Sequence, residues 1–134
     1  MNEVEVGEYV RTKTGRITKI IKIDKCIITV GHGMQEIKLY AKFSNSHIIH
    51  ADDYQELYKE INKYIVKHSK ILAEVVEVGD YVNGKRIHKI DKGKNYCYLY
   101  YGNCKTFVDY QIKKIWTKEK LKTIEYDVGG LAYE

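Results

Sequence analysis

The sequence predicts a mainly β (α+β) protein made of two related small barrels packed together, with one amphipathic helix and short helical turns. Three observations predict this fold: a segment that occurs twice, several hairpin-type turns, and strands in which apolar and polar residues alternate. The chain has 134 residues, and we expect the two units to span residues 1–72 and 73–134. Lobes of about 65 residues are marginal alone, so we expect them to pack against each other.

The internal repeat is the clearest organisational feature. Val4–Val10 reads Val-Glu-Val-Gly-Glu-Tyr-Val and returns as Val76–Val82 with a single change between acidic residues. A second match aligns Arg16–Ile20 with Arg86–Ile90, after a contraction in the intervening turn. Matches of this kind predict that the two units share one structural plan.

Each unit opens with a predicted hairpin. Gly7 and Gly79 stand where the chain must turn before a strand. The turn after that strand is Lys13–Gly15 in the first unit and Asn83–Lys85 in the second, where Asn-Gly is a strong hairpin signal.

A second hairpin is predicted in the second unit, from Asn95–Tyr101 through a two-residue Gly102-Asn103 turn to Cys104–Tyr110. This register pairs Leu99 with Thr106. One face then carries Cys97, Leu99, Thr106 and Val108, and the other carries Tyr96, Tyr98, Tyr100 and Phe107. A looser hairpin within Ile27–Tyr40 is expected to be its counterpart in the first unit.

The longest predicted helix is Asp53–Lys63. Apolar residues recur there at helical spacing, and Asp52 or Asp53 is a suitable N-cap. Short helical segments are also predicted at Lys70–Glu74 and Lys118–Thr123, after Ser69 and Thr117 as N-caps.

The sequence contains none of the usual catalytic signatures, neither a nucleophile elbow nor a phosphate-binding glycine loop. Cys26, Cys97 and Cys104 form no C-x-x-C pair, which argues against a zinc ribbon and favours reduced thiols. The stretch His47–Asp53 could ligate a metal or serve acid–base chemistry, but a strand–helix junction explains it better, since the aspartates are needed as caps. We therefore expect no catalytic residue, no metal and no cofactor.

Two sets of residues are candidates for binding. The aromatic set is a face of the second-unit hairpin, which is either the partner-binding surface or the barrel core: Tyr96, Tyr98, Tyr100 and Phe107. The basic set could contact nucleic-acid phosphates or simply solvate the surface of a chain with net charge +5: Arg11, Lys13, Arg16, Lys19, Lys85, Arg86 and Lys89. A small-ligand (nucleotide) sponge that uses a groove between the units or an oligomer interface is a third alternative.

Two resemblances extend this interpretation. The segments Val6–Val10 and Arg16–Ile20, with their copies in the second unit, resemble the first hairpin of Src-homology-3-like barrels of the KOW and Tudor kind. Three segments together also resemble small phage and prophage proteins of low-GC Gram-positive bacteria: Val6–Thr12, then Val66–Lys70 leading to Glu77–Gly84, and Ile115–Glu119.

The phage resemblance implies an accessory protein in the cytoplasm of a bacterial host. Its partner would be a host protein or nucleoprotein complex, and it could be a counter-defence (anti-CRISPR-like) inhibitor. The sequence has no apolar run long enough to cross a membrane, and it predicts no oligomeric state.

Overall fold

The computed structural model describes residues 3–120, which form two compact units. The first comprises residues 3–13 and Ile17–Lys70, and the second comprises Thr14–Arg16 and residues 71–120. The turn Thr14–Arg16 therefore groups with the second unit, where the Thr117 hydroxyl donates a hydrogen bond of 2.6 Å to the Gly15 carbonyl. The boundaries predicted from the sequence place Thr14–Arg16 in the first unit, so the assignment of this turn differs from the prediction.

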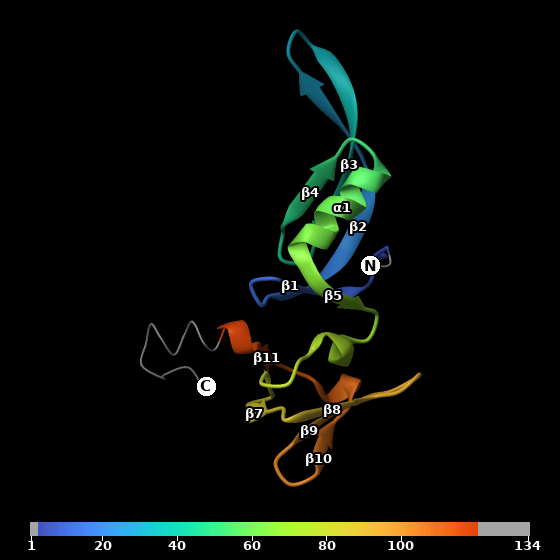
Figure 1. Cartoon of the computed structure of the whole chain (residues 1–134). Helices are drawn as coiled ribbons and strands as arrows, with labels where there is room; N and C mark the ends of the chain where they lie inside the picture. Colours follow the sequence, from blue (N-terminus) through green and yellow to red (C-terminus); the bar gives the residue numbers. More distant parts are fainter. Residues whose placement is uncertain (1–2, 121–134) are drawn as a thin grey trace. The chain divides into compact units, whose positions relative to one another are not determined.

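The first unit contains one antiparallel sheet (Figure 1). Its strands are β1 (Tyr9–Thr12), β2 (Ile17–Val30), β3 (Met34–Phe43), β4 (Ile48–Ala51) and β5 (Ile65–Ser69), and their order across the sheet is β4-β3-β2-β1-β5. The single α-helix of this unit, α1 (Tyr54–Tyr64), connects β4 to β5.

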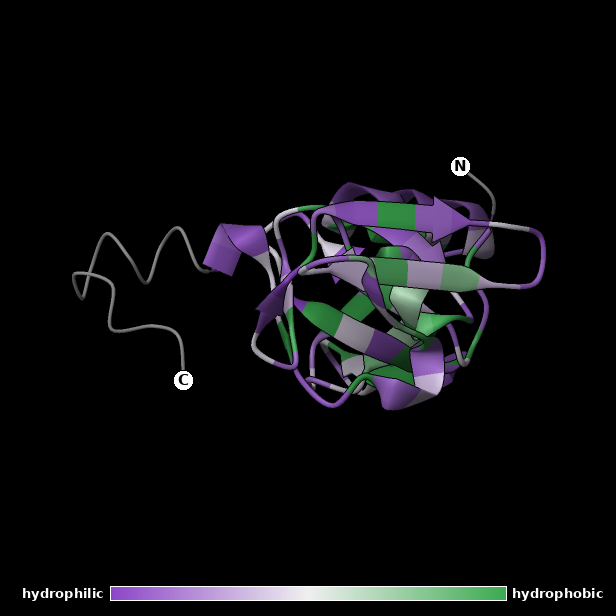
Figure 2. Cartoon of the chain, turned by 90° about the horizontal axis from the view of Figure 1, so that it is seen from below, coloured by the Kyte–Doolittle hydropathy of each residue, from purple (hydrophilic) through white to green (hydrophobic). Residues whose placement is uncertain are grey.

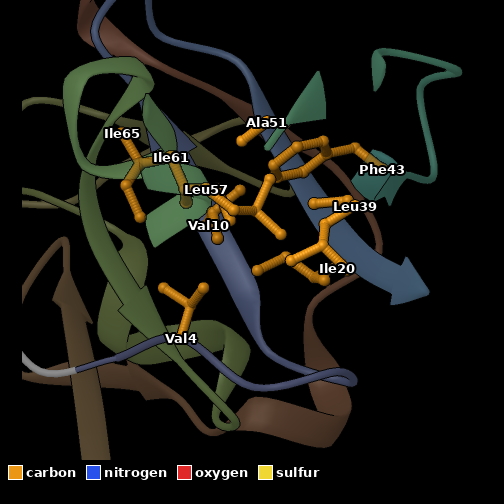
Figure 3. Close-up of a cluster of buried hydrophobic side chains, with 10 residues drawn as sticks. Val4, Val10, Ile20, Leu39, Phe43, Ala51, Leu57, Ile61 and Ile65 are labelled. Carbon is orange, nitrogen blue, oxygen red and sulfur yellow. The ribbon is translucent and has the colours of Figure 1, made fainter. Parts of the chain in front are cut away.

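Helix α1 begins where the sequence predicts, at an aspartate cap. The Asp53 carboxylate accepts a hydrogen bond of 2.8 Å from the Glu56 amide. Leu57 and Ile61, one turn apart, are fully buried. Figure 3 shows them pointing into one cluster with side chains from the strands. That core consists of Val4, Val10, Ile20, Leu39, Ala41, Phe43, Ala51, Leu57, Ile61 and Ile65.

The second unit contains two three-stranded antiparallel sheets and its own core. Its elements are η1 (Leu72–Val75), β6 (Tyr81–Val82), β7 (Lys85–Arg86), β8 (Lys89–Lys92), β9 (Cys97–Tyr101), β10 (Lys105–Phe107), η2 (Asp109–Gln111) and β11 (Ile115–Trp116). The sheet orders are β11-β6-β7 and β10-β9-β8. Hydrophobic and hydrophilic segments alternate along the strands (Figure 2). The predicted helix Lys118–Thr123 lies partly outside the described residues.

The two units follow one strand order. Only Ile87 and His88 separate β7 from β8, so the two can be read as one interrupted strand that corresponds to β2. The second unit then reads β11-β6-(β7, β8)-β9-β10, which matches β5-β1-β2-β3-β4. By this alignment the β2–β3 hairpin corresponds to the β8–β9 connection. The predicted equivalence between Ile27–Tyr40 and the β9–β10 hairpin is therefore wrong.

Backbone hydrogen bonds confirm the match between Val4–Val10 and Val76–Val82. They correct the match between Arg16–Ile20 and Arg86–Ile90. The Gly7 amide donates to the Ile20 carbonyl at 2.7 Å, and the Gly79 amide donates to the Ile87 carbonyl at 2.9 Å. Ile20 therefore corresponds to Ile87, and the predicted alignment of Ile20 with Ile90 is wrong. The physical reason is the turn between the first two strands, which is shortened further in the second unit than the sequence match assumes.

The acidic residue of the repeat is buried in both units. In the first, Glu8 accepts from the Glu5 amide at 2.6 Å and contacts His68 Nδ1 at 2.9 Å. In the second, Asp80 accepts from the Glu77 amide at 2.8 Å and from the Lys118 amide at 2.9 Å. Each carboxylate thus connects the first turn of its unit to residues at or just after the last strand of that unit.

We expect Asp80→Ala to lower the free energy of unfolding by about 2–4 kcal/mol, because it leaves two amides without their acceptor in a fully buried position. Asp80→Asn, which keeps one acceptor oxygen, should cost less. Denaturant titration measures both. Glu3→Ala, at an exposed position, is the control and should change stability by less than about 0.5 kcal/mol. Equal stabilities for Asp80→Ala and Glu3→Ala would contradict the structural role of Asp80.

Candidate partner-binding face

The side chains of β9 alternate between the core and the solvent. Leu99 is fully buried and Cys97 is 5% exposed, while Tyr98 between them is 37% exposed. Burial raises the pKa of the Cys97 thiol, with a further contribution from the charge of Glu74. The interpretation in which the tyrosine side of this strand forms the core is therefore wrong. We call the outward group Lys89, Tyr96, Tyr98 and Tyr100 the tyrosine face.

Tyr96 and Tyr98 form an exposed aromatic pair. Their ring centroids are 5.0 Å apart with planes inclined by 30°, and Tyr96 is 44% exposed. Gly93 makes this arrangement fit, because a Cβ at that position would collide with the Tyr96 ring. The Gly93 amide also donates a hydrogen bond of 2.9 Å to the Tyr96 carbonyl, which fixes the turn between β8 and β9.

A lysine extends the tyrosine face onto the neighbouring strand. Lys89 is paired with Tyr100 in the β8–β9 register, and its ammonium group lies 5.1 Å from the centroid of the Tyr100 ring. This distance is within the range of a cation–π contact. Asp91 stands opposite Tyr98 in the same register. With Asp91 beside it, the tyrosine face therefore has aromatic rings next to charges of both signs.

Phe107 does not belong to this face, although the sequence register placed it there. The structure pairs Phe107 with Leu99, so both side chains lie on the core side. Phe107 also stacks on Tyr101 with centroids 4.3 Å apart. The turn has three residues, Gly102 to Cys104, with positive φ at both ends. One additional turn residue shifts the register by one and moves Phe107 to the other face.

The basic residues predicted to contact nucleic acid do not form one set. Arg11 is fully buried in β1, so it cannot contribute to a surface site. Lys13 is exposed in the first unit, where Lys19 lies with its ammonium 5.1 Å from the centroid of the Tyr9 ring. The other four basic residues are exposed and belong to the second unit: Arg16, Lys85, Arg86 and Lys89.

The histidine–aspartate stretch forms a strand–helix junction. Asp53 caps α1, Asp52 pairs with Lys38, and the His47 ring stacks on Tyr64 with centroids 4.2 Å apart. Within residues 3–120, no three His, Cys, Asp or Glu side chains are grouped so that they could hold a metal ion.

A groove of about 990 Å³ in the first unit runs beside α1. Its lining includes Glu3, Lys13, Tyr54, Tyr58 and Lys63. Burial raises the pKa of Tyr58, with a further contribution from the charge of Glu3. The lining of this groove thus combines aromatic and basic side chains with the acidic Glu3.

Sequence reasoning missed a second exposed surface. Ile27, Met34 and Ile37 are each about two-thirds exposed near the end of the β2–β3 hairpin. The sequence held one signal of this surface, the length of the hairpin. Strands β2 and β3 are much longer than β1 and β4, so the apolar residues near the turn lie beyond the strands that pair with them.

No protein-family model, curated protein or solved structure matches this chain. Among the helices within residues 3–120, none has the length and apolar character needed to cross a bilayer.

Proposed function

We propose that this chain is a non-enzymatic binding protein that recognises a macromolecule through the tyrosine face of its second unit. The observation that carries the proposal is the alternation along β9, which buries Leu99 and presents Tyr98 beside Tyr96. Tyrosines are enriched among the residues that dominate binding energy at protein interfaces. A pair of adjacent, partly exposed tyrosine rings is suited to such contacts, because few rotatable bonds must be fixed on binding.

A protein or nucleoprotein complex of a bacterial host is the proposed partner. The resemblance to phage and prophage proteins supports this class of partner, and a counter-defence inhibitor acting in the host cytoplasm is the specific form that we propose. We further propose that each unit is a small Src-homology-3-like barrel. The strand order that the two units share supports this proposal, as does the short helix η2 before the last strand of the second unit.

We expect wild-type protein immobilised on a resin to retain a defined protein from nuclease-treated bacterial lysate, and Tyr98→Ala to lose at least nine-tenths of it. A loss of this size corresponds to about 1.4 kcal/mol, within the range for one aromatic anchor. The matched control is Tyr110→Ala, which removes a tyrosine that is 82% exposed but lies outside the tyrosine face. Quantitative mass spectrometry of the eluates makes the comparison. Equal loss with both variants would contradict recognition through the tyrosine face.

Nucleic acid is the second candidate partner, and the Lys89–Tyr100 contact favours it. Single-stranded nucleic acids bind to surfaces where bases stack on aromatic rings and basic residues contact phosphates. Lys85, Arg86 and Lys94 are further exposed basic residues of the same unit. The tyrosine face therefore carries the residue types that this alternative requires.

For the nucleic-acid candidate, affinity for labelled single- or double-stranded DNA or RNA should fall about a thousandfold between 50 and 200 mM salt, if about six phosphates are contacted. Fluorescence anisotropy measures the dissociation constant. Lys89→Gln should weaken binding and flatten its salt dependence by about one phosphate contact. Absence of binding at the lower salt concentration, or affinity independent of salt, would contradict this candidate and leave the protein partner.

A further inference from the structure

The β2–β3 hairpin of the first unit ends in a two-stranded arm, Cys26–Lys38. Strand β4 pairs with β3 only at Leu39–Lys42, and β1 pairs with β2 only at Ile17–Lys19. Among residues 3–120, no other strand pairs with the arm. Figure 1 shows the arm projecting beyond β4 and α1.

The arm exposes apolar side chains that its own unit does not cover. Ile27 and Ile37 face each other across the strands and are 67% and 65% exposed, and Met34 is 66% exposed. A two-stranded hairpin in water is at best marginally stable, and further strands stabilise it. A further strand beside the arm would both stabilise the hairpin and place side chains next to these exposed apolar residues.

The two edges of the arm differ in their protection against pairing. On β3, Glu36 and Lys38 provide charges, which natural sheet edges use to prevent association. On β2, Cys26–Val30 reads Cys-Ile-Ile-Thr-Val and contains neither a charged residue nor proline. High β-propensity without charge or proline is the pattern of a segment that pairs with another strand. The outer edge of β2 is therefore the available edge.

We infer that two copies of this chain pair through the outer edges of their β2 strands, antiparallel about a two-fold axis at Ile27. Ile27 then lies opposite Ile27 of the second copy. Since Ile37 already faces Ile27 within each chain, the pairing forms a row of four isoleucines across a four-stranded ribbon. Such an interface is isologous, because both copies use the same surface.

The charges of β2 disfavour two neighbouring registers, and the alignment of the exposed Ile27–Ile37 pairs selects the axis at Ile27 among the others. An axis at Asp24 or at Lys25 would place like charges opposite each other, which is destabilising. With the axis at Ile27, Lys25 faces Thr29 of the second copy and Asp24 faces Val30. The turn Gly31–Gly33 of each chain then ends opposite residues 21–23 of the other, before the segment of β2 that pairs with β1.

Sedimentation equilibrium of the full chain tests the dimer. We expect wild-type protein to have twice the 15.7 kDa mass of one chain at tens of micromolar. Ile27→Lys, which places two ammonium groups at the two-fold axis, should raise the dimer dissociation constant at least a hundredfold. Tyr110→Lys adds the same charge at an exposed position of the second unit and should change nothing. A monomeric wild type, or a dimer that Ile27→Lys leaves intact, would overturn the inference.

Cysteine cross-linking tests the register in a Cys26→Ser, Cys104→Ser background. Ile27→Cys should form an intermolecular disulfide under mild oxidation, because residues directly opposite in an antiparallel pair have Cα atoms about 4.5–5.5 Å apart. Thr29→Cys is the matched control. Its two copies would be separated by four residues along the strands, about 13 Å, which is too far for a disulfide. Cross-linking through position 29 but not through position 27 would refute the register.

Discussion

The buried carboxylate of the repeated segment is the constraint on which both units depend. Glu8 and Asp80 each accept the amide three residues earlier, which closes the turn that begins the unit. Each also binds a group at or just after the last strand, the His68 ring in one unit and the Lys118 amide in the other. Because a buried acceptor must keep its donors, this acid holds the beginning and the end of each unit together, which accounts for its presence in both copies of the repeat.

A shared framework leaves the connections free to diverge, and the two units have diverged at equivalent places. The connection between the second and third strands is a long two-stranded arm in the first unit and a short turn, residues 93–96, in the second. The short turn orders Tyr96 against Gly93, beside Tyr98. The arm instead extends apolar residues away from its own core. The same strand order thus presents a tyrosine face in one unit and a free sheet edge in the other.

Local signals in the sequence predicted helices and turns well. They predicted less well which side chains of a strand point to the core. Helix α1 followed from apolar periodicity and an aspartate cap, and the recurrence of Val-Gly-acid-Tyr-Val correctly indicated equivalent turns. The register of the β9–β10 hairpin was wrong by one residue, because Gly102-Asn103 fits a two-residue turn and nothing in the sequence shows that Cys104 adopts positive φ. The burial of Arg11 was not predictable either, because Arg11 follows the core residue Val10 in β1 and its side chain therefore lies on the opposite face of the sheet from that core.

The proposed function depends on Tyr98 facing solvent while Leu99 faces the core. Hydroxyl-radical footprinting with mass spectrometry measures both neighbours at once, each relative to its own oxidation rate in the unfolded chain. We expect Tyr98 to be oxidised within a few-fold of its unfolded rate and Leu99 to be protected at least tenfold. Protection of Tyr98 together with oxidation of Leu99 would contradict the tyrosine face and the binding role proposed for it.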